Sequence, residues 1–183
     1  DVVKSGLKSN VNLVPIVTPG RPTIRKRRFI EPGHLTKLFE VQYLDDSDFE
    51  EPVENRILSA VEERAPSHDL VIVNDFGHGL MTGRVRDALR DSETYLALNT
   101  QTNSANLGFN LITKYERANY CCIDQAEAML ASGLPHGSAA ECASELIGRV
   151  NADWFMATTG IHGATLVLSD NGVFANPALA TRV

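Results

Sequence analysis

Four short apolar runs, each followed by a polar residue, constrain the fold of this chain more than any other feature. The runs occupy residues 70–73, 94–98, 118–123 and 153–157. Segments with helical spacing separate several of them, and this alternation predicts an α/β fold with a largely parallel sheet. The carboxyl ends of parallel strands meet at one edge, which is where open α/β sheets bind ligands.

The polar residues that end these runs are therefore expected to gather along one edge of the sheet. They are Asn74 and Asp75, Asn99, Asp124, and Thr158 with Thr159. The same residue types also cap helices, and Asp124 is well placed to begin the helix that follows it. A shared ligand-binding edge and a set of simple helix caps both remain open as interpretations.

Helices are predicted over residues 51–64, 124–131 and 138–150, where apolar residues recur every three or four positions. Thr82 can cap a further helix that carries Val85, Ala88 and Leu89 on one side.

Two hairpins are also expected. Residues 23–30 and 35–44 are β-prone runs joined by the turn at residues 31–34, and the charges on both faces of the first run indicate that it lies outside a core. Residues 164–175 form the second, with a positive-φ turn at residues 170–172. Residues 11–17 predict another strand, with Pro15 favouring an edge position.

Composition excludes several classes of protein. The formal net charge of -6 argues against a nucleic-acid partner. No apolar run approaches the roughly 20 residues of a membrane span, and the first residues lack the pattern of a signal peptide. The three cysteines, Cys121, Cys122 and Cys142, have no paired spacing. We expect reduced, partly buried thiols and a cytoplasmic location.

Taken in order, the first hairpin, residues 74–79, residues 124–127 and residues 158–163 resemble motifs of the ribokinase-like (PfkB) carbohydrate kinases. The closest branch is the heptose-phosphate kinase domain of bacterial ADP-heptose synthesis proteins. The resemblance implies a ribokinase-like (Rossmann-like) three-layer sandwich with a mostly parallel sheet and a β-hairpin lid. Residues 1–48 correspond to the lid region, and residues 49–183 to the central α/β region of a kinase domain that is incomplete at both ends.

That resemblance implies ATP-dependent phosphoryl transfer to the hydroxyl of a sugar or sugar phosphate. The implied cofactors are ATP and Mg²⁺, and a homodimer through the lid hairpin is implied as a possible assembly. The implied site residues are Asn74, Asp75, Arg25 and Arg27 for substrate, Thr158, Thr159, Gly160, Gly163 and Asn99 for nucleotide, and Asp124 and Glu127 for metal.

Each of these assignments has a structural alternative. Asp75 suits a turn-stabilising Asx motif, Asp124 and Glu127 suit a capped helix, and Gly160 and Gly163 suit a tight turn. Arg25 and Arg27 share one strand face and suit phosphate binding by arginine forks, but a charged strand also discourages edge-to-edge pairing.

The sequence departs from the family pattern at four points. The Asp-Pro-Lys motif is Asn99-Thr100-Gln101, the asparagine of the Asn-x-x-Glu motif is Asp124, and the lysine of the Asp-Tyr-x-Lys-Gly motif is His78. The Gly-Ala-Gly-Asp motif that supplies the catalytic base does not occur before Val183. We therefore expect no catalytic residue in these 183 residues and no activity from them alone.

A degenerate kinase fold that serves as a binding or regulatory module is the alternative function. An unrelated Rossmann-like domain is disfavoured because no Gly-x-Gly-x-x-Gly motif opens a helix in this sequence.

Overall fold

A computed structural model of the chain describes residues 2–45, 47–102 and 106–179. The chain forms two compact units, residues 1–56 and residues 57–183, which we describe separately. The predicted division into a lid region (1–48) and an α/β region (49–183) stays a prediction.

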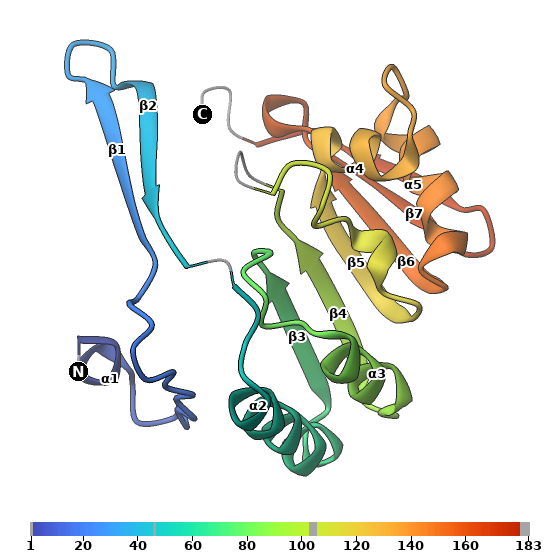
Figure 1. Cartoon of the computed structure of the whole chain (residues 1–183). Helices are drawn as coiled ribbons and strands as arrows, with labels where there is room; N and C mark the ends of the chain where they lie inside the picture. The colour runs from blue at the N-terminus through green and yellow to red at the C-terminus, as the bar shows by residue number, and fades with distance from the viewer. Residues whose placement is uncertain (1, 46, 103–105, 180–183) are drawn as a thin grey trace. The chain divides into compact units, whose positions relative to one another are not determined.

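The first unit is built around an antiparallel hairpin (Figure 1). Strands β1 (Arg25–Glu31) and β2 (Thr36–Tyr43) pair as predicted, with a bulge between Phe29 and Ile30. Backbone N–H groups of Gly33 and His34 donate to the Glu31 carboxylate and fix the turn. A short helix, α1 (Val2–Gly6), precedes the hairpin.

The predicted strand at residues 11–17 is wrong. These residues carry no strand or helix, and Val11, Leu13, Val14 and Val17 are exposed. Pro15 removes one backbone donor, and the run does not alternate apolar with polar residues. A strand also needs a neighbour to accept its hydrogen bonds, and the two strands of this unit pair only with each other.

The second unit contains one six-stranded sheet in the order β3-β4-β5-β6-β7-β8. The strands are β3 (Leu70–Asp75), β4 (Tyr95–Thr100), β5 (Ala118–Asp124), β6 (Ala152–Thr158), β7 (Ala164–Leu168) and β8 (Val173–Asn176). Strands β3 to β6 run parallel, β7 is antiparallel to β6, and β8 is antiparallel to β7 and so runs in the direction of β3 to β6. The predicted α/β class, mostly parallel sheet and second hairpin are confirmed, and Asn171 has the expected positive φ of 72°.

One face of the sheet carries the core. Its central row of register partners is Val73, Leu98, Cys121, Phe155 and Val167, and all five are buried. Helix α5 (Ala139–Arg149) packs against β6 and β7, and α4 (Gln125–Ser132) lies beside α5 (Figure 1). Burial raises the pKa of the Cys121 thiol to about 12, helped by the neighbouring Cys122. The three cysteines are free, as predicted.

The opposite face of the sheet is partly exposed. The adjacent register row is Ile72, Ala97, Tyr120, Trp154 and Leu168. Ile72 is 63% exposed and Trp154 is 49% exposed, whereas the alternate residues of the same strands are buried. The period-two alternation of the strands therefore separates a packed face from an open one.

Helices α2 to α5 begin within one residue of the predicted positions, whereas α1 was not predicted. Helix α2 (Glu51–Arg64) has the predicted bounds. Thr82 caps α3 (Gly83–Asp91), on which Val85 and Leu89 are buried. Asp124 and Ser138 each form a capping box at the start of α4 and α5. Three single turns of 3₁₀ helix lie at η1 (Ala65–Ser67), η2 (Ile112–Lys114) and η3 (Gly160–His162). Throughout the ranges that the structure describes, no helix is both long and apolar enough to cross a bilayer.

Candidate functional site at the carboxyl edge of the sheet

The polar ends of β3 to β6 meet at one edge, as predicted. Asn74 pairs in register with Asn99, and Asp75 with Thr100, where β3 and β4 end. Asp124 pairs with Thr158 where β5 and β6 end. Because these four strands are parallel, the residues that follow them emerge on the same side of the sheet.

Asp75 is the most heavily bonded of these residues. Its side chain is 3% exposed. One carboxylate oxygen, Oδ1, accepts the N–H of Gly77 at 2.9 Å. This is the contact of the turn-stabilising Asx motif, which the sequence offered as the structural alternative for Asp75. The other, Oδ2, lies 2.5 Å from the Lys114 ammonium and accepts the Tyr115 hydroxyl at 2.8 Å. Both oxygens are thus bonded within the chain.

Lys114, Tyr115 and Asn110 complete this cluster, and sequence reasoning did not identify them. The Asn110 amide donates to the backbone oxygens of Asp75 and Gln101, and its own oxygen accepts Lys114. Burial and the adjacent Asp75 charge raise the pKa of Tyr115, so its hydroxyl stays protonated and donates. These residues lie near a 3₁₀ turn of three residues, which leaves no periodic signal in the sequence.

The loop after Asp75 is closely packed against residues 106–110. Gly77 has a φ of 71°, a region that glycine adopts readily. A Cβ at this position would overlap the Asn106 side chain and lie 2.8 Å from Cγ of Asn110. The Asn106 amide donates to the Phe76 carbonyl at 3.1 Å. The glycine is therefore required by a close approach between two loops at the edge.

Asn74 and Asn99 lie on the open face of the sheet and differ in their contacts. Asn74 is exposed. Asn99 is half-buried, and its amide donates to the Cys122 carbonyl at 2.7 Å. Asn99 therefore links β4 to β5, and its predicted role toward nucleotide stays a prediction.

Asp124 and Glu127 form the capping box of α4. The Glu127 N–H donates to Asp124 Oδ1 at 2.8 Å, and Glu127 Oε2 accepts the Asp124 N–H at 3.1 Å. Glu127 Oε1 also accepts the N–H of Thr102 at 2.6 Å, which ties the end of β4 to this helix. The capped-helix interpretation is thus realised. A cavity of about 230 Å³ adjoins the pair, and its described lining also includes Thr102, Leu107, Ala126 and Leu130.

Replacing Glu127 should change how stability depends on pH. Burial raises the pKa of Glu127 above 4.5, as does the Asp124 charge, although the two backbone hydrogen bonds act against this. A raised pKa means stability that is present below the unfolded-state value and is lost as pH rises through the folded-state value. The variant Glu127→Gln keeps a hydrogen-bond acceptor but does not titrate. Its stability relative to the native chain should therefore rise as pH increases from the unfolded-state pKa to the folded-state pKa of Glu127.

Urea unfolding at a series of pH values from about 2.5 to 7 measures this difference and also covers the range below 4.5 that the control requires. The matched control is Glu141→Gln in the capping box of α5, where hydrogen bonds from the Ser138 backbone and hydroxyl lower the Glu141 pKa. That stability is lost as pH falls through the folded-state pKa, so this variant should change with the opposite sign. Parallel curves for native and Glu127→Gln chains would contradict the expectation.

Residues 158–163 turn the chain from β6 into β7. The Thr158 hydroxyl donates to the Ile123 carbonyl, and the Thr159 N–H donates to the Gly163 carbonyl at 2.8 Å. Gly160 and Gly163 have φ values of 59° and 103°. A Cβ at Gly163 would overlap the Asn176 carbonyl oxygen, whereas one at Gly160 would meet nothing within 4 Å. Packing therefore explains why residue 163 is a glycine, whereas the space around Gly160 would admit a Cβ.

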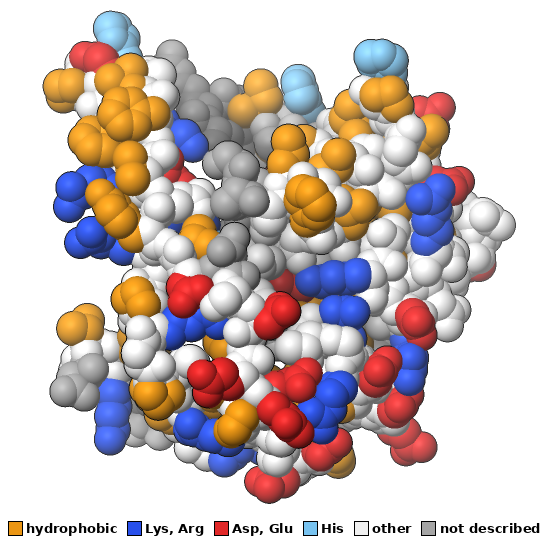
Figure 2. All heavy atoms as spheres, viewed as in Figure 1, with side chains coloured by type: hydrophobic (Ala, Val, Ile, Leu, Met, Phe, Trp, Pro, Cys, Tyr) orange, Lys and Arg blue, Asp and Glu red, His pale blue; other side chains and the backbone are white. Residues whose placement is uncertain are grey.

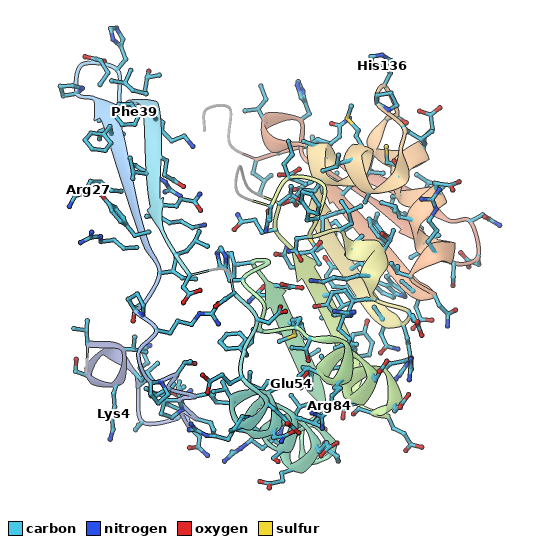
Figure 3. The ribbon with its side chains drawn as sticks, in the orientation of Figure 1. Lys4, Arg27, Phe39, Glu54, Arg84 and His136 are labelled. Atoms are coloured by element: carbon cyan, nitrogen blue, oxygen red, sulfur yellow. The ribbon has the colours of Figure 1, made fainter. Side chains whose placement is uncertain are left out.

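The hairpin of the first unit carries Arg25 and Arg27 on one face, as predicted. Arg25 pairs with Tyr43 in register, and its guanidinium lies 4.2 Å from the centre of that ring. Further along the same face, the rings of Phe29 and Phe39 stack at 4.4 Å. Arg27 and Phe39 are labelled in Figure 3, and Figure 2 shows apolar and basic side chains side by side on the hairpin. This face is both cationic and aromatic.

Proteins of known sequence resemble this chain over nearly its whole length. The bifunctional protein HldE of Nitrobacter hamburgensis is 26% identical over 174 residues, which are 92% of this chain and 34% of that protein. The bifunctional protein HldE of Rhodopseudomonas palustris is 24% identical over 186 residues, 99% of this chain and 37% of that protein. The chain therefore spans about a third of the length of these curated relatives. No family model matches it.

Solved structures identify the fold. The nucleoside kinase of Burkholderia thailandensis, in complex with inosine, superposes with a TM-score of 0.54 at 16% identity, over 91% of this chain and 50% of that one. Phosphofructokinase-2 of Escherichia coli, in a tetrameric inhibited form, superposes with a TM-score of 0.54 at 12% identity, over 75% of this chain and 46% of that one. The fold is that of the ribokinase-like kinases. The resemblance read from the motifs, to this family and to its ADP-heptose synthesis branch, is confirmed.

The fold thus brings two groups of predicted residues to one edge. Asn74, Asp75 and Asn99 lie where β3 and β4 end, and Asp124, Glu127 and Thr158 lie where β5 and β6 end. Their roles toward substrate, nucleotide and metal stay predictions. In the part of the chain that the structure describes, no three or more His, Cys, Asp or Glu side chains form a metal-binding group.

Proposed function

We propose that this chain is the central part of an ATP-dependent sugar or sugar-phosphate kinase of the heptose-phosphate type. The observation that carries the proposal is the order of polar residues along the carboxyl edge of a parallel sheet, within a ribokinase-like fold. The similarity to HldE proteins over almost the whole chain supports the heptose-phosphate branch. Phosphoryl transfer depends on positioning and charge stabilisation, and an edge of this kind collects the groups for both.

The implied nucleotide cofactor is ATP with Mg²⁺, and Asp124 and Glu127 are the proposed metal-side residues. Two carboxylates are too few to enclose Mg²⁺, but the ion usually keeps several waters and bridges to phosphates. The pair fits this mode, because each capping contact uses one lone pair of a carboxylate oxygen and leaves others. Bound there, Mg²⁺ would neutralise charge on the transferred phosphate. Thr158, Thr159, Gly160, Gly163 and Asn99 are the proposed nucleotide-side residues.

Asn74, Arg25 and Arg27 are the proposed contacts to the sugar or sugar phosphate, and Asp75 is proposed to serve the same substrate. Guanidinium groups bind phosphate in a bidentate manner, which supports the two arginines. The hairpin also exposes Phe39 and Leu38, and a two-stranded sheet by itself is marginally stable. A homodimer through the hairpin is therefore proposed.

The proposal is tested with the full-length protein, ATP, Mg²⁺ and a panel of sugar phosphates that includes heptose phosphates. ADP release that depends on one sugar phosphate is the expected result. Nucleotide binding without turnover on any member of the panel would instead indicate a degenerate kinase fold that acts as a binding module. The uncharged Asn99-Thr100-Gln101, in which Asn99 already bonds to Cys122, favours this second candidate.

Loss of the cationic hairpin face should weaken sugar-phosphate binding. The double variant Arg25→Ala/Arg27→Ala is expected to lower affinity by about ten- to a hundredfold, the range for one lost charged hydrogen bond. Calorimetric titration of the full-length protein measures it. Lys26→Ala/Arg28→Ala removes the same charge from the other face, where Arg28 bonds to Glu40, and should have the smaller effect. Equal effects would show that only net charge matters.

A further inference from the structure

We infer that Asp75 is a positioning residue which joins two loops at the carboxyl edge, and that Asn74 alone of this pair meets the ligand. The inference rests on the proposed function and refines it. The two residues are adjacent in the strand, so their side chains leave opposite faces of the sheet. Asn74 is exposed, whereas Asp75 is 4% exposed. They therefore have different surroundings at the same place in the sequence.

The chain itself occupies most of the bonding capacity of the Asp75 carboxylate. A carboxylate accepts hydrogen bonds through two oxygens. Oδ1 holds the Gly77 N–H, and Oδ2 holds both Lys114 and Tyr115. The backbone oxygen of the same residue accepts the N–H of Gln101 at 2.8 Å and the Asn110 amide at 3.0 Å. A sugar hydroxyl would have to reach Oδ1 on a side chain that is 3% exposed, or displace one of these buried partners, which is costly.

The partners of Asp75 come from three separate segments. Gly77 lies in the loop after β3, Gln101 follows β4, and Asn110, Lys114 and Tyr115 belong to the segment before β5. The Asn110 side chain also accepts a hydrogen bond from the Lys114 ammonium and donates one to the Gln101 carbonyl, so the partners of Asp75 are bonded to each other as well. One buried carboxylate thus fixes the loop after β3 and the segment before β5 with respect to the strand ends. A displacement of about 1 Å in such groups is enough to slow catalysis a hundredfold.

The charge of Asp75 is balanced within the same cluster. Lys114 is 24% exposed, with its ammonium 5.6 Å from the centre of the Tyr115 ring. The family motif has lysine where this chain has His78, and an uncharged Gln101 stands where it has a second lysine. Lys114 is a cation that the fold brings to this edge from a different segment. A buried carboxylate with a lysine, a tyrosine hydroxyl and a backbone N–H is an internal structural unit, not an open ligand site.

Variants of the full-length kinase test this assignment. In Asp75→Asn, hydrogen exchange at the Gly77 and Gln101 amides should accelerate by about ten- to a hundredfold, because a buried charged network loses its anion. Tyr115→Phe should act in the same direction, and the double variant should fall short of the sum because both belong to one network. Both should lower kcat more than they raise KM for the sugar phosphate. Asn74→Ala should raise KM and leave exchange at these two amides unchanged.

Glu116→Gln is the matched control, because its exposed carboxylate pairs with Arg90 at 2.8 Å and should affect neither readout. Two results would overturn the inference. A rise in KM for Asp75→Asn without faster exchange would make Asp75 a direct ligand. Faster exchange with unchanged kcat and KM would make the cluster purely structural. If the native protein shows no turnover, the proposed function fails, and the exchange coupling between Asp75 and Tyr115 still decides whether they act as one unit.

Discussion

Phe155→Ala should destabilise the chain by about 3–5 kcal/mol, the usual cost of truncating a buried phenylalanine. Phe155 is 0% exposed in β6, between Cys121 and Val167 in the buried row of the sheet. Helix α5 packs against β6 and β7, so a cavity there lies between rigid elements that cannot close over it. Urea unfolding followed by circular dichroism measures the loss, and the dependence on urea concentration should keep its slope.

Trp154→Ala is the matched control for this experiment. Trp154 precedes Phe155 in the same strand but lies on the open face, in register with Tyr120 and Leu168. Its removal forfeits its cross-strand contacts with these two residues, each worth about 0.2–1 kcal/mol, so the loss should stay below about 2 kcal/mol. Similar losses in the two variants would mean that both faces of the sheet are packed in solution.

Gly163→Ala should cost about 2–4 kcal/mol, of which the glycine-only backbone conformation accounts for about 1–3 kcal/mol. Gly163 has φ 103° and ψ −133°, and an added Cβ would overlap the backbone oxygen of Asn176. Neither the turn nor the end of β8 can move without breaking the β7–β8 pairing. The same urea titration reports the loss of stability.

Gly160→Ala separates the two causes, because it lies in the same turn with φ 59° and open space around it. It should cost about 1–2 kcal/mol, the price of a left-handed conformation alone. If the two alanine variants lose equal stability, then the close approach to Asn176 contributes nothing and the account of Gly163 is wrong.

Much of the fold followed from local signals. The bounds of α2, the caps Thr82 and Asp124, and the turn around Asn171 depend on residues within a few positions of each other. The common edge followed as well, since parallel strands bring their carboxyl ends together. The predicted strand at residues 11–17 failed because an apolar run does not reveal whether a pairing partner exists.

The sequence by itself determined the α/β class, the family resemblance and the set of polar residues at the sheet edge, because each depends on order and spacing along the chain. Only the tertiary structure decided which of those residues already have partners. Asp75 is bonded to Lys114 and Tyr115, roughly forty positions away in the chain, whereas its neighbour Asn74 stays exposed. Such contacts are set by how loops pack at the ends of strands, and packing between distant segments leaves no periodic trace in the sequence.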